Sequence, residues 1–337
     1  MKVLICEQPG ELSYGEKPVP DLAEGYSLIK IRRIGVCGTD LHAFEGTQPY
    51  FNYPRILGHE LSGELLEPNG AKGFTKGDRV TFIPYFNCGV CIACKAGKPN
   101  CCVKINVFGV HIDGGMAEYV TVPSQSLVHS EGLSFDELAL VEPLAIGAHG
   151  VNRARVQAGE YVLVIGAGPI GLGVIEFARI AGGKVIAMDI NAERLEFCRT
   201  HLKVDHIINV AEGDVIQQLN AITGNNMAEV VIDATGNQNA INNGFQYMAH
   251  GGRYVLVGLQ KGEIKFSHPE FHKREATLMS SRNATRADFE QVVLAIKEKL
   301  IDPNHYITHR VQFDDVKQDF EGWLNPANGV IKAMIAL

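Results

Sequence analysis

The sequence has no excess of basic residues and no long uninterrupted apolar run. Among its 337 residues, 31 are Lys or Arg and 38 are Asp or Glu, which gives a formal net charge of −7 at pH 7. Proteins that bind nucleic acid through its phosphates carry a basic excess, so this balance argues against that class. The most apolar stretch, YVLVIGAGPIGLGVI, contains several glycines and is followed by Glu176, which argues against a membrane span. The opening residues, MKVLICEQPGE, hold too short an apolar run for a secretory signal, so we expect a cytoplasmic location.

Cysteines are few outside one cluster, because five of the eight lie between Cys88 and Cys102. The cytosol keeps thiols reduced, so such a cluster there is more often a metal site than a disulfide framework. Four thiolates fill a tetrahedral zinc ion and leave no position for substrate, which predicts a structural zinc in the lobe 88–102. Cys101 is the spare thiol and could exchange with Cys102, although Cys102 is preferred. The predicted ligands are Cys88, Cys91, Cys94 and Cys102.

The pattern of apolar residues predicts two kinds of structure. Residues up to about 130 contain short β-like runs separated by Gly and Pro, such as MKVLIC, YSLIKIRRIGV, RVTFIP and AEYVTVP. From Tyr161 onwards, apolar strands alternate with helical segments (GLGVIEFARIAG, AERLEFCRTHL, NAINNGFQYMAH), which is typical of a doubly wound parallel sheet. A helix at RADFEQVVLAIKEKL and two β-like segments close the chain. The sequence therefore predicts an α/β protein in which a β-rich domain is interrupted by an inserted nucleotide-binding domain.

A glycine motif follows the first strand of the inserted segment. Gly166, Gly168 and Gly171 form a GxGxxG pattern that opens a helix, and Asp189 ends the next strand. This context predicts a dinucleotide site, with the pyrophosphate at the helix N-terminus and Asp189 on the ribose hydroxyls. The charge of Asp189 would repel a 2′-phosphate and favours NAD over NADP. The alternative is a tight turn in an ordinary βαβ unit. The candidate cofactor-binding residues are Gly166, Gly168, Pro169, Ile170, Gly171, Asp189 and Arg194.

Several residues that could bind a second metal are individually uninformative. They lie in the segments GVCGTDLH, GHELSG and VEPLA. A lone Cys is usually an inert thiol and a lone His is usually a surface or core residue. A catalytic zinc needs fewer protein ligands than a structural one and an open position, which this combination could provide. The residues are Cys37, Thr39, His42, His59, Glu60 and Glu142.

The order of these motifs, together with the cysteine lobe and VIGAGPIG, resembles the zinc-containing medium-chain dehydrogenase/reductase family over essentially the whole chain. The resemblance implies a GroES-like catalytic domain formed by residues 1–147 and 285–337, and a Rossmann NAD-binding domain at residues 148–284. It also implies an NAD-dependent oxidoreductase with two zinc ions per chain, one catalytic and one structural. A homo-oligomer, either a dimer or a tetramer, is expected on the same ground.

The resemblance assigns a role to each candidate. Cys37 and His59 match catalytic zinc ligands, and Glu142 matches the third ligand position, where typical alcohol dehydrogenases carry a cysteine. Glu60 matches a nearby carboxylate that takes a coordination place when substrate is absent. Thr39 matches the hydroxyl that contacts the substrate alcohol, and His42 the relay that passes its proton outwards.

Longer segments, among them GTQPYFNYPRILGHE and GLQKGEIKFSHPEFHKRE, resemble bacterial L-galactonate (hexonate) 5-dehydrogenases within this family. This implies oxidation of a sugar-acid hydroxyl to a keto-acid. Arg282 lies where polyol dehydrogenases carry a substrate-contacting Arg and could pair with an aldonate carboxylate or only bind neutral hydroxyls. Asn283 and Phe51 are further substrate candidates. Phe44, Phe51 and Tyr53 are candidates to line the pocket, although aromatic residues in such a loop are as often packing residues. The alternatives are a neutral polyol or L-threonine dehydrogenase and, more remotely, a non-catalytic relative with a binding or regulatory role.

Overall fold

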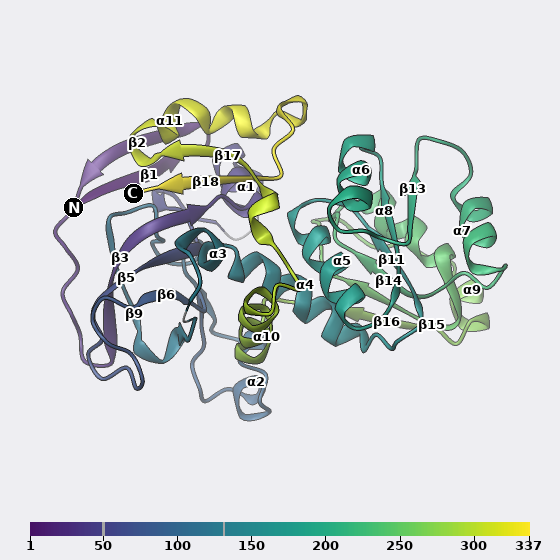
Figure 1. Cartoon of the computed structure of the whole chain (residues 1–337), viewed down its shortest axis with the longest axis horizontal. Coiled ribbons are helices and arrows are strands. Elements are labelled where there is room, and N and C mark those ends of the chain that lie inside the picture. The colour runs from purple at the N-terminus through teal and green to yellow at the C-terminus, as the bar shows by residue number, and fades with distance from the viewer. Residues whose placement is uncertain (49–50, 131) are drawn as a thin grey trace. The chain divides into compact units, whose positions relative to one another are not determined.

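The computed structural model describes residues 1–48, 51–130 and 132–337. The chain divides into two compact units (Figure 1): unit 1 comprises Met1–Pro143 and Thr285–Leu337, and unit 2 comprises Leu144–Ala284. The first boundary falls inside helix α4 (Val141–Ala154), four residues before the predicted domain limit at 147. Among the described residues, no helix combines the length and apolar character needed to cross a membrane.

Unit 1 consists mainly of strands. Its largest sheet has the order β10-β6-β5-β3-β18-β17, with β9 also paired to β3; two smaller sheets have the orders β2-β1-β4 and β7-β8. The strands are β1 (Lys2–Gln8), β2 (Glu11–Glu16), β3 (Tyr26–Gly35), β4 (Arg55–Ile56), β5 (Glu60–Glu67), β6 (Arg79–Phe82), β7 (Tyr85–Phe86), β8 (Asn106–Val107), β9 (Tyr119–Pro123), β10 (Leu127–Val128), β17 (Ile307–Gln312) and β18 (Lys332–Ala336). The helices of unit 1 are α1 (Gly38–Glu45), α2 (Ile92–Lys95), α3 (Phe135–Ala139), α10 (Arg286–Lys297) and α11 (Val316–Asp319).

One core holds the strands of unit 1 together. Buried apolar side chains from five strands belong to a single cluster, represented by Leu4, Ile31, Leu61, Val80 and Ile335. The last of these lies on β18, near the end of the sequence, and β18 pairs antiparallel with β3. The C-terminal segment is therefore part of the central sheet of unit 1.

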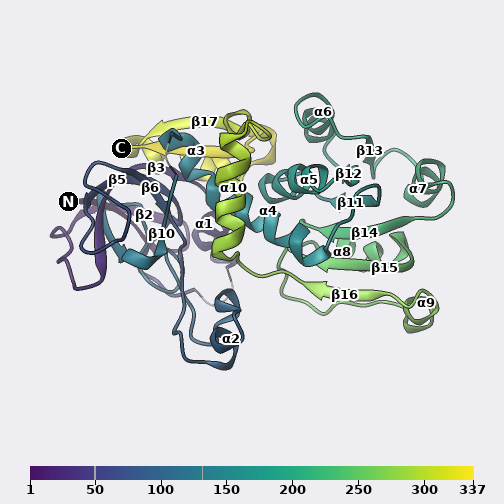
Figure 2. The ribbon, with the colours of Figure 1, turned by 60° about the horizontal axis from the view of Figure 1, so that its bottom comes forward.

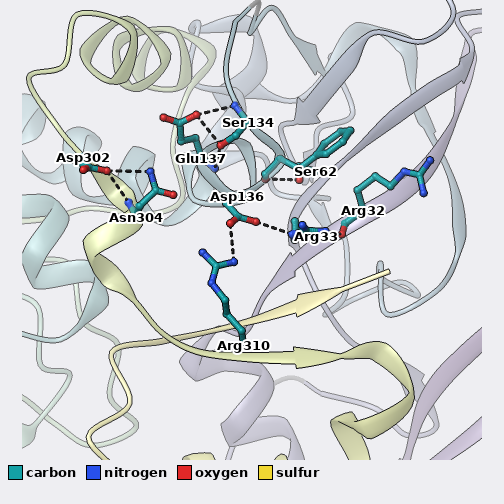
Figure 3. Close-up of polar contacts among 10 residues, drawn as sticks. Arg32, Arg33, Ser62, Ser134, Asp136, Glu137, Asp302, Asn304 and Arg310 are labelled. Atoms are coloured by element: carbon teal, nitrogen blue, oxygen red, sulfur yellow. Dashed lines mark hydrogen bonds and ion pairs between the residues drawn. The ribbon is translucent and has the colours of Figure 1, made fainter.

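Hydrogen bonds and an ion pair connect helix α3 to this sheet, just before α4 begins (Figure 3). Asp136 accepts a hydrogen bond from Arg33 on β3 at 2.6 Å and forms an ion pair with Arg310 on β17 at 2.6 Å. Ser134 and Glu137 form a capping box, which satisfies the free N–H groups of the first helical turn. The hydroxyl of Ser62 on β5 donates to the Phe135 carbonyl at 2.6 Å. These contacts position the start of α4, which carries Glu142.

Unit 2 contains one six-stranded sheet in which every pair is parallel, in the order β13-β12-β11-β14-β15-β16 (Figure 2). This order is that of the dinucleotide-binding doubly wound fold, in which ligands bind beyond the carboxyl ends of the central strands. The strands are β11 (Tyr161–Ile165), β12 (Lys184–Asp189), β13 (His206–Asn209), β14 (Ala228–Asp233), β15 (Met248–Leu256) and β16 (Thr277–Ser280). The helices are α5 (Pro169–Ile180), α6 (Ala192–Thr200), α7 (Val215–Thr223), α8 (Gln238–Gly244) and α9 (His268–Lys273).

The predicted fold class is confirmed, and one predicted helix is too long. The segment NAINNGFQYMAH was expected to be helical throughout, but α8 ends at Gly244 and Met248 begins β15. The buried side chains of Met248 and Tyr254 belong to the core of unit 2, so tertiary packing outweighs the local helical pattern.

Candidate active site and metal centres

Three predicted site residues converge in unit 1. Cys37 caps the N-terminus of α1, two residues after the end of β3, and Glu60 begins β5, directly preceded by His59. Because β5 pairs antiparallel with β3 and places Glu60 opposite Gly35, these two strand ends bring the side chains together. Their donor atoms all lie within 4.8 Å of one another, and His59 and Glu60 are buried.

Asp40 holds two of these residues in place and was missed by the sequence analysis. Its Oδ2 accepts the N–H of Cys37 and its Oδ1 accepts the N–H of Gly58, both at 3.0 Å. The same Oδ1 lies 3.7 Å from Nδ1 of His59. Asp40 is fully buried, which is rare for a carboxylate without a positioning or binding role. The available signal was its place three residues after Cys37, at the capping-box position of α1.

Glu142 is buried in the first turn of α4 but lies outside the group formed by Cys37, His59 and Glu60. The hydroxyl of Tyr85, also buried, donates a hydrogen bond to Oε1 of Glu142. The structure thus brings the predicted alternate ligand, Glu60, into the group, whereas the predicted third ligand is hydrogen-bonded to Tyr85. Tyr85 carried no recognisable motif in the sequence.

The charges of the site influence its protonation. Burial raises the pKa of Glu142 to about 7. Burial alone would lower the pKa of His59, but the negative charges of Cys37 and Asp40 outweigh it and hold that pKa well above its usual value. Without a metal ion, the site therefore binds protons near neutral pH.

This donor set fits a zinc ion. Thiolate sulfur, imidazole nitrogen and carboxylate oxygen are the ligands that zinc prefers, and a catalytic zinc has three protein ligands and one open position. Among the described residues, His59 Nδ1 is buried without a hydrogen-bond partner, and Oδ1 of Asp40 lies 3.7 Å from it, farther than a hydrogen bond reaches.

The other predicted site residues of unit 1 lie nearby in the sequence but differ in the exposure of their side chains and in the groups that they contact. Thr39 is half-buried in the first turn of α1, whereas the side chain of His42 is 60% exposed and its Nδ1 lies 3.2 Å from Glu45. Phe51 packs edge-on against Tyr53, with ring centroids 4.8 Å apart. Phe44 is buried against Phe320 and belongs to the core, so it is a packing residue.

The four cysteines predicted to form the structural site converge in a lobe that contains α2 (Figure 1). The sulfur of Cys91 lies 3.5 Å from that of Cys94 and 3.9 Å from that of Cys102. Sulfurs around a tetrahedral zinc, with Zn–S bonds of about 2.3 Å, lie about 3.8 Å apart, so the spacing fits. Backbone N–H groups lower the pKa of Cys91 to about 6, which favours the thiolate that zinc requires. Cys101 is exposed and outside the group.

Replacing Cys102 by serine is expected to remove one zinc ion per chain and to lower the melting temperature, because the lobe loses a ligand. Zinc content by mass spectrometry and thermal unfolding measure both effects. Cys101→Ser is the matched control and should change neither. Equal zinc loss in both variants would contradict the assignment of Cys102 over its neighbour.

The glycine motif of unit 2 lies between β11 and α5, as predicted. Gly166 has a positive φ of 98°, and a Cβ on Gly171 would lie 1.8 Å from the Gly166 carbonyl oxygen. Asp189 ends β12, and its Oδ2 accepts the N–H of Ala167 in the loop at 2.6 Å. Arg194 on α6 has a guanidinium nitrogen 3.8 Å from the Cβ position of Gly168. The remaining motif residues, Pro169 and Ile170, form the first turn of α5.

Arg282 and Asn283 follow β16 at the end of unit 2. Arg282 is exposed, and Asn283 has a positive φ of 53°. Their contact with substrate remains a prediction.

Zinc uptake by the group formed by Cys37, His59 and Glu60 is expected to depend on pH. If Glu142 and His59 bind zinc as the sequence predicts, zinc displaces the protons that Glu142, with a pKa of about 7, and His59 hold in the metal-free protein. Affinity should therefore rise as the pH increases through 7 and fall below it. Calorimetric zinc titration of protein loaded only at the cysteine lobe, at about pH 6 and about pH 8, measures this change. Glu142→Gln should show a shallower dependence, and a pH-independent affinity would contradict the expectation.

Comparison with known proteins identifies the family. The description "Alcohol dehydrogenase GroES-like domain" matches residues 23–132, and "Zinc-binding dehydrogenase" matches residues 169–298. The chain belongs to the zinc-type alcohol dehydrogenase family of oxidoreductases. It is similar to the L-galactonate-5-dehydrogenase of Escherichia coli K12, with 45% identity over 99% of this chain and 98% of that protein.

Solved structures support the nicotinamide cofactor. A short chain alcohol dehydrogenase from Escherichia coli CFT073 in complex with NADH has a TM-score of 0.92 and 28% identity, covering 100% of this chain and 99% of that one. A zinc-binding dehydrogenase from Sinorhizobium meliloti 1021 bound to NADP has a TM-score of 0.92 and 27% identity, with the same coverage. Zinc and a nicotinamide dinucleotide are thus the cofactors of this family.

Proposed function

We propose that the protein oxidises a secondary hydroxyl of a hexonate sugar acid, of the L-galactonate or L-gulonate kind, to a keto-hexuronate with hydride transfer to NAD. The observation that supports the substrate class is the 45% identity to L-galactonate-5-dehydrogenase over nearly the whole of both chains. The group formed by Cys37, His59 and Glu60 supports zinc-dependent chemistry in unit 1.

In this proposal Cys37, His59 and Glu142 hold the catalytic zinc, and Glu60 is the alternate carboxylate. When bound, zinc would supply a Lewis acid that stabilises negative charge on the substrate oxygen, and NAD would supply the hydride acceptor. The hydroxyl proton would leave through the Thr39 hydroxyl, which gives up its own proton as it receives one, and then via the cofactor ribose to His42, whose exposed side chain passes it to solvent. The substrate thus loses one hydride and one proton and becomes a ketone.

Arg282 is proposed to bind the carboxylate that distinguishes a sugar acid from a neutral polyol. A guanidinium can donate two parallel hydrogen bonds to a carboxylate, which an ammonium cannot reproduce. Asn283 and Phe51 would contact the rest of the substrate.

A substrate panel tests the proposal. Purified zinc-loaded protein is mixed with aldonates, neutral polyols or L-threonine and NAD, and the reduced cofactor is followed by its absorbance. We expect activity on hexonates. Activity confined to polyols or to L-threonine would overturn the substrate class while leaving the family intact.

NAD is proposed as the preferred cofactor because Asp189 ends β12, where this fold carries the acidic residue that binds the ribose, and its negative charge would repel the 2′-phosphate of NADP. Asp189→Ser is expected to raise the KM for NAD and to improve the use of NADP by roughly 10-fold or more, since a charge repulsion is removed. Glu193→Ser, which removes a negative charge on the neighbouring helix α6, is the control and should change neither. A wild-type protein that prefers NADP would contradict the assignment.

A further inference from the structure

The last strand of the chain places a charged side chain beside the proposed catalytic metal site. Lys332 begins β18, and its side chain is 3% exposed. Its Nζ donates hydrogen bonds to both carboxylate oxygens of Glu60, at 2.6 Å each, and to the carbonyl of Val36 at 3.1 Å. A lysine is rarely this buried unless it is paired, so the ion pair with Glu60 accounts for its position.

The carboxylate of Glu60 also lies close to the backbone of β3. Gly35 is paired with Glu60 across the sheet, and a Cβ at Gly35 would lie 2.2 Å from Oε2 of Glu60. Glycine at this position therefore leaves the space that the carboxylate occupies. The space left by Gly35 admits the carboxylate, and the ammonium of Lys332 binds both of its oxygens.

The same carboxylate has an oxygen within 4.8 Å of the Cys37 sulfur and a His59 ring nitrogen. An ammonium group and a metal ion would thus share one carboxylate. The ammonium donates hydrogen bonds to the lone pairs that metal coordination needs, and its charge compensates the carboxylate in a buried setting where charges interact strongly. Both effects lower the affinity of Glu60 for a metal ion.

We propose that Lys332 is a positioning residue that keeps Glu60 a weak, exchangeable zinc ligand. The inference rests on the proposed function for the presence of zinc between Cys37 and His59. With Lys332 in place, Glu60 would bind zinc weakly enough for a substrate oxygen to take its place. In a variant without the ammonium, the zinc ion would compensate the negative charge of Glu60 instead, and the carboxylate would bind zinc more tightly.

The test compares zinc-loaded wild-type protein with Lys332→Met and Lys332→Arg. The readouts are the rate at which a chromogenic chelator removes zinc, and kcat and KM for a hexonate. The phase of zinc release that is absent from Cys37→Ser belongs to the catalytic site. Lys332→Met should release this zinc roughly 10-fold more slowly, which is the size of effect that outer partners of metal ligands produce. The kcat of this variant should fall by a larger factor than the factor by which its KM changes. Lys332→Arg, which keeps the charge, should remain close to wild type.

The double variant Lys332→Met/Glu60→Gln removes both charges and keeps the side-chain volumes, so it remains informative if Lys332→Met does not fold. It should release catalytic zinc at the wild-type rate within about two-fold, because Glu60 contributes little to zinc retention when Lys332 is present. Unchanged or faster release from folded Lys332→Met, or much faster release from the double variant, would overturn the inference. Zinc release needs no substrate, so these outcomes are distinct from inactivity on hexonates, which would overturn the proposed function.

Discussion

Replacing Cys37 by serine is expected to reduce hexonate oxidation by at least about 10³-fold, because the Lewis acid that the proposed site holds contributes several kcal/mol to the reaction. The thiol is one of three donors within 4.8 Å of one another, and a serine hydroxyl is a poor zinc ligand at neutral pH. Zinc content should fall from two ions per chain to one, with the remaining ion in the cysteine lobe.

Cofactor binding separates loss of the metal from loss of the fold. The glycine loop and Asp189 lie in unit 2, whereas Cys37 lies in unit 1. NADH binding, measured by fluorescence titration, should therefore remain within about three-fold of wild type, since the replaced side chain is not part of the predicted dinucleotide site and unit 2 is left unchanged. Cys101→Ser, an exposed thiol outside both metal groups, is the matched control and should stay active. Undiminished turnover by Cys37→Ser, or by His59→Ala, would contradict the metal assignment.

Patterns that are local in the sequence predicted their structures well. The alternation of strands and helices gave the parallel sheet of unit 2 because each element carries its own hydrophobic period. The spacing of the cysteines indicated a metal lobe because four thiols within fifteen residues can meet without help from distant segments. The glycine motif was recognisable for the same reason.

Contacts between distant segments could not be predicted in this way. Tyr85 and Glu142 are 57 positions apart, and Lys332 and Glu60 are 272 positions apart. The second pair depends on the order β5-β3-β18, which brings the end of the chain beside the middle of unit 1. No single-residue pattern specifies that order. The environment of each candidate ligand, and the proximity of Glu60 rather than Glu142 to Cys37 and His59, therefore emerged only from the fold.

The glycine loop of unit 2 allows the packing role of a glycine to be separated from its role in cofactor binding. At Gly171, a methyl group would lie 1.8 Å from the carbonyl oxygen of Gly166 and 2.8 Å from its carbonyl carbon. Both are backbone atoms that cannot rotate away, so α5 would have to shift from the loop. At Gly168, the nearest atom is the guanidinium nitrogen of Arg194 at 3.8 Å, which is an ordinary contact, and φ is −77°.

Gly171→Ala is therefore expected to destabilise the protein by about 3 kcal/mol or more, as overpacking against fixed backbone does, and to abolish NADH binding. Gly168→Ala should fold with nearly wild-type stability yet bind NADH roughly 10-fold more weakly or worse, because a methyl group there obstructs the approach of the pyrophosphate to the start of α5. Chemical denaturation and fluorescence titration measure the two properties separately.

Wild-type stability of Gly171→Ala would contradict the close approach of helix and loop. Wild-type NADH affinity of Gly168→Ala would contradict the expected approach of the pyrophosphate to this residue.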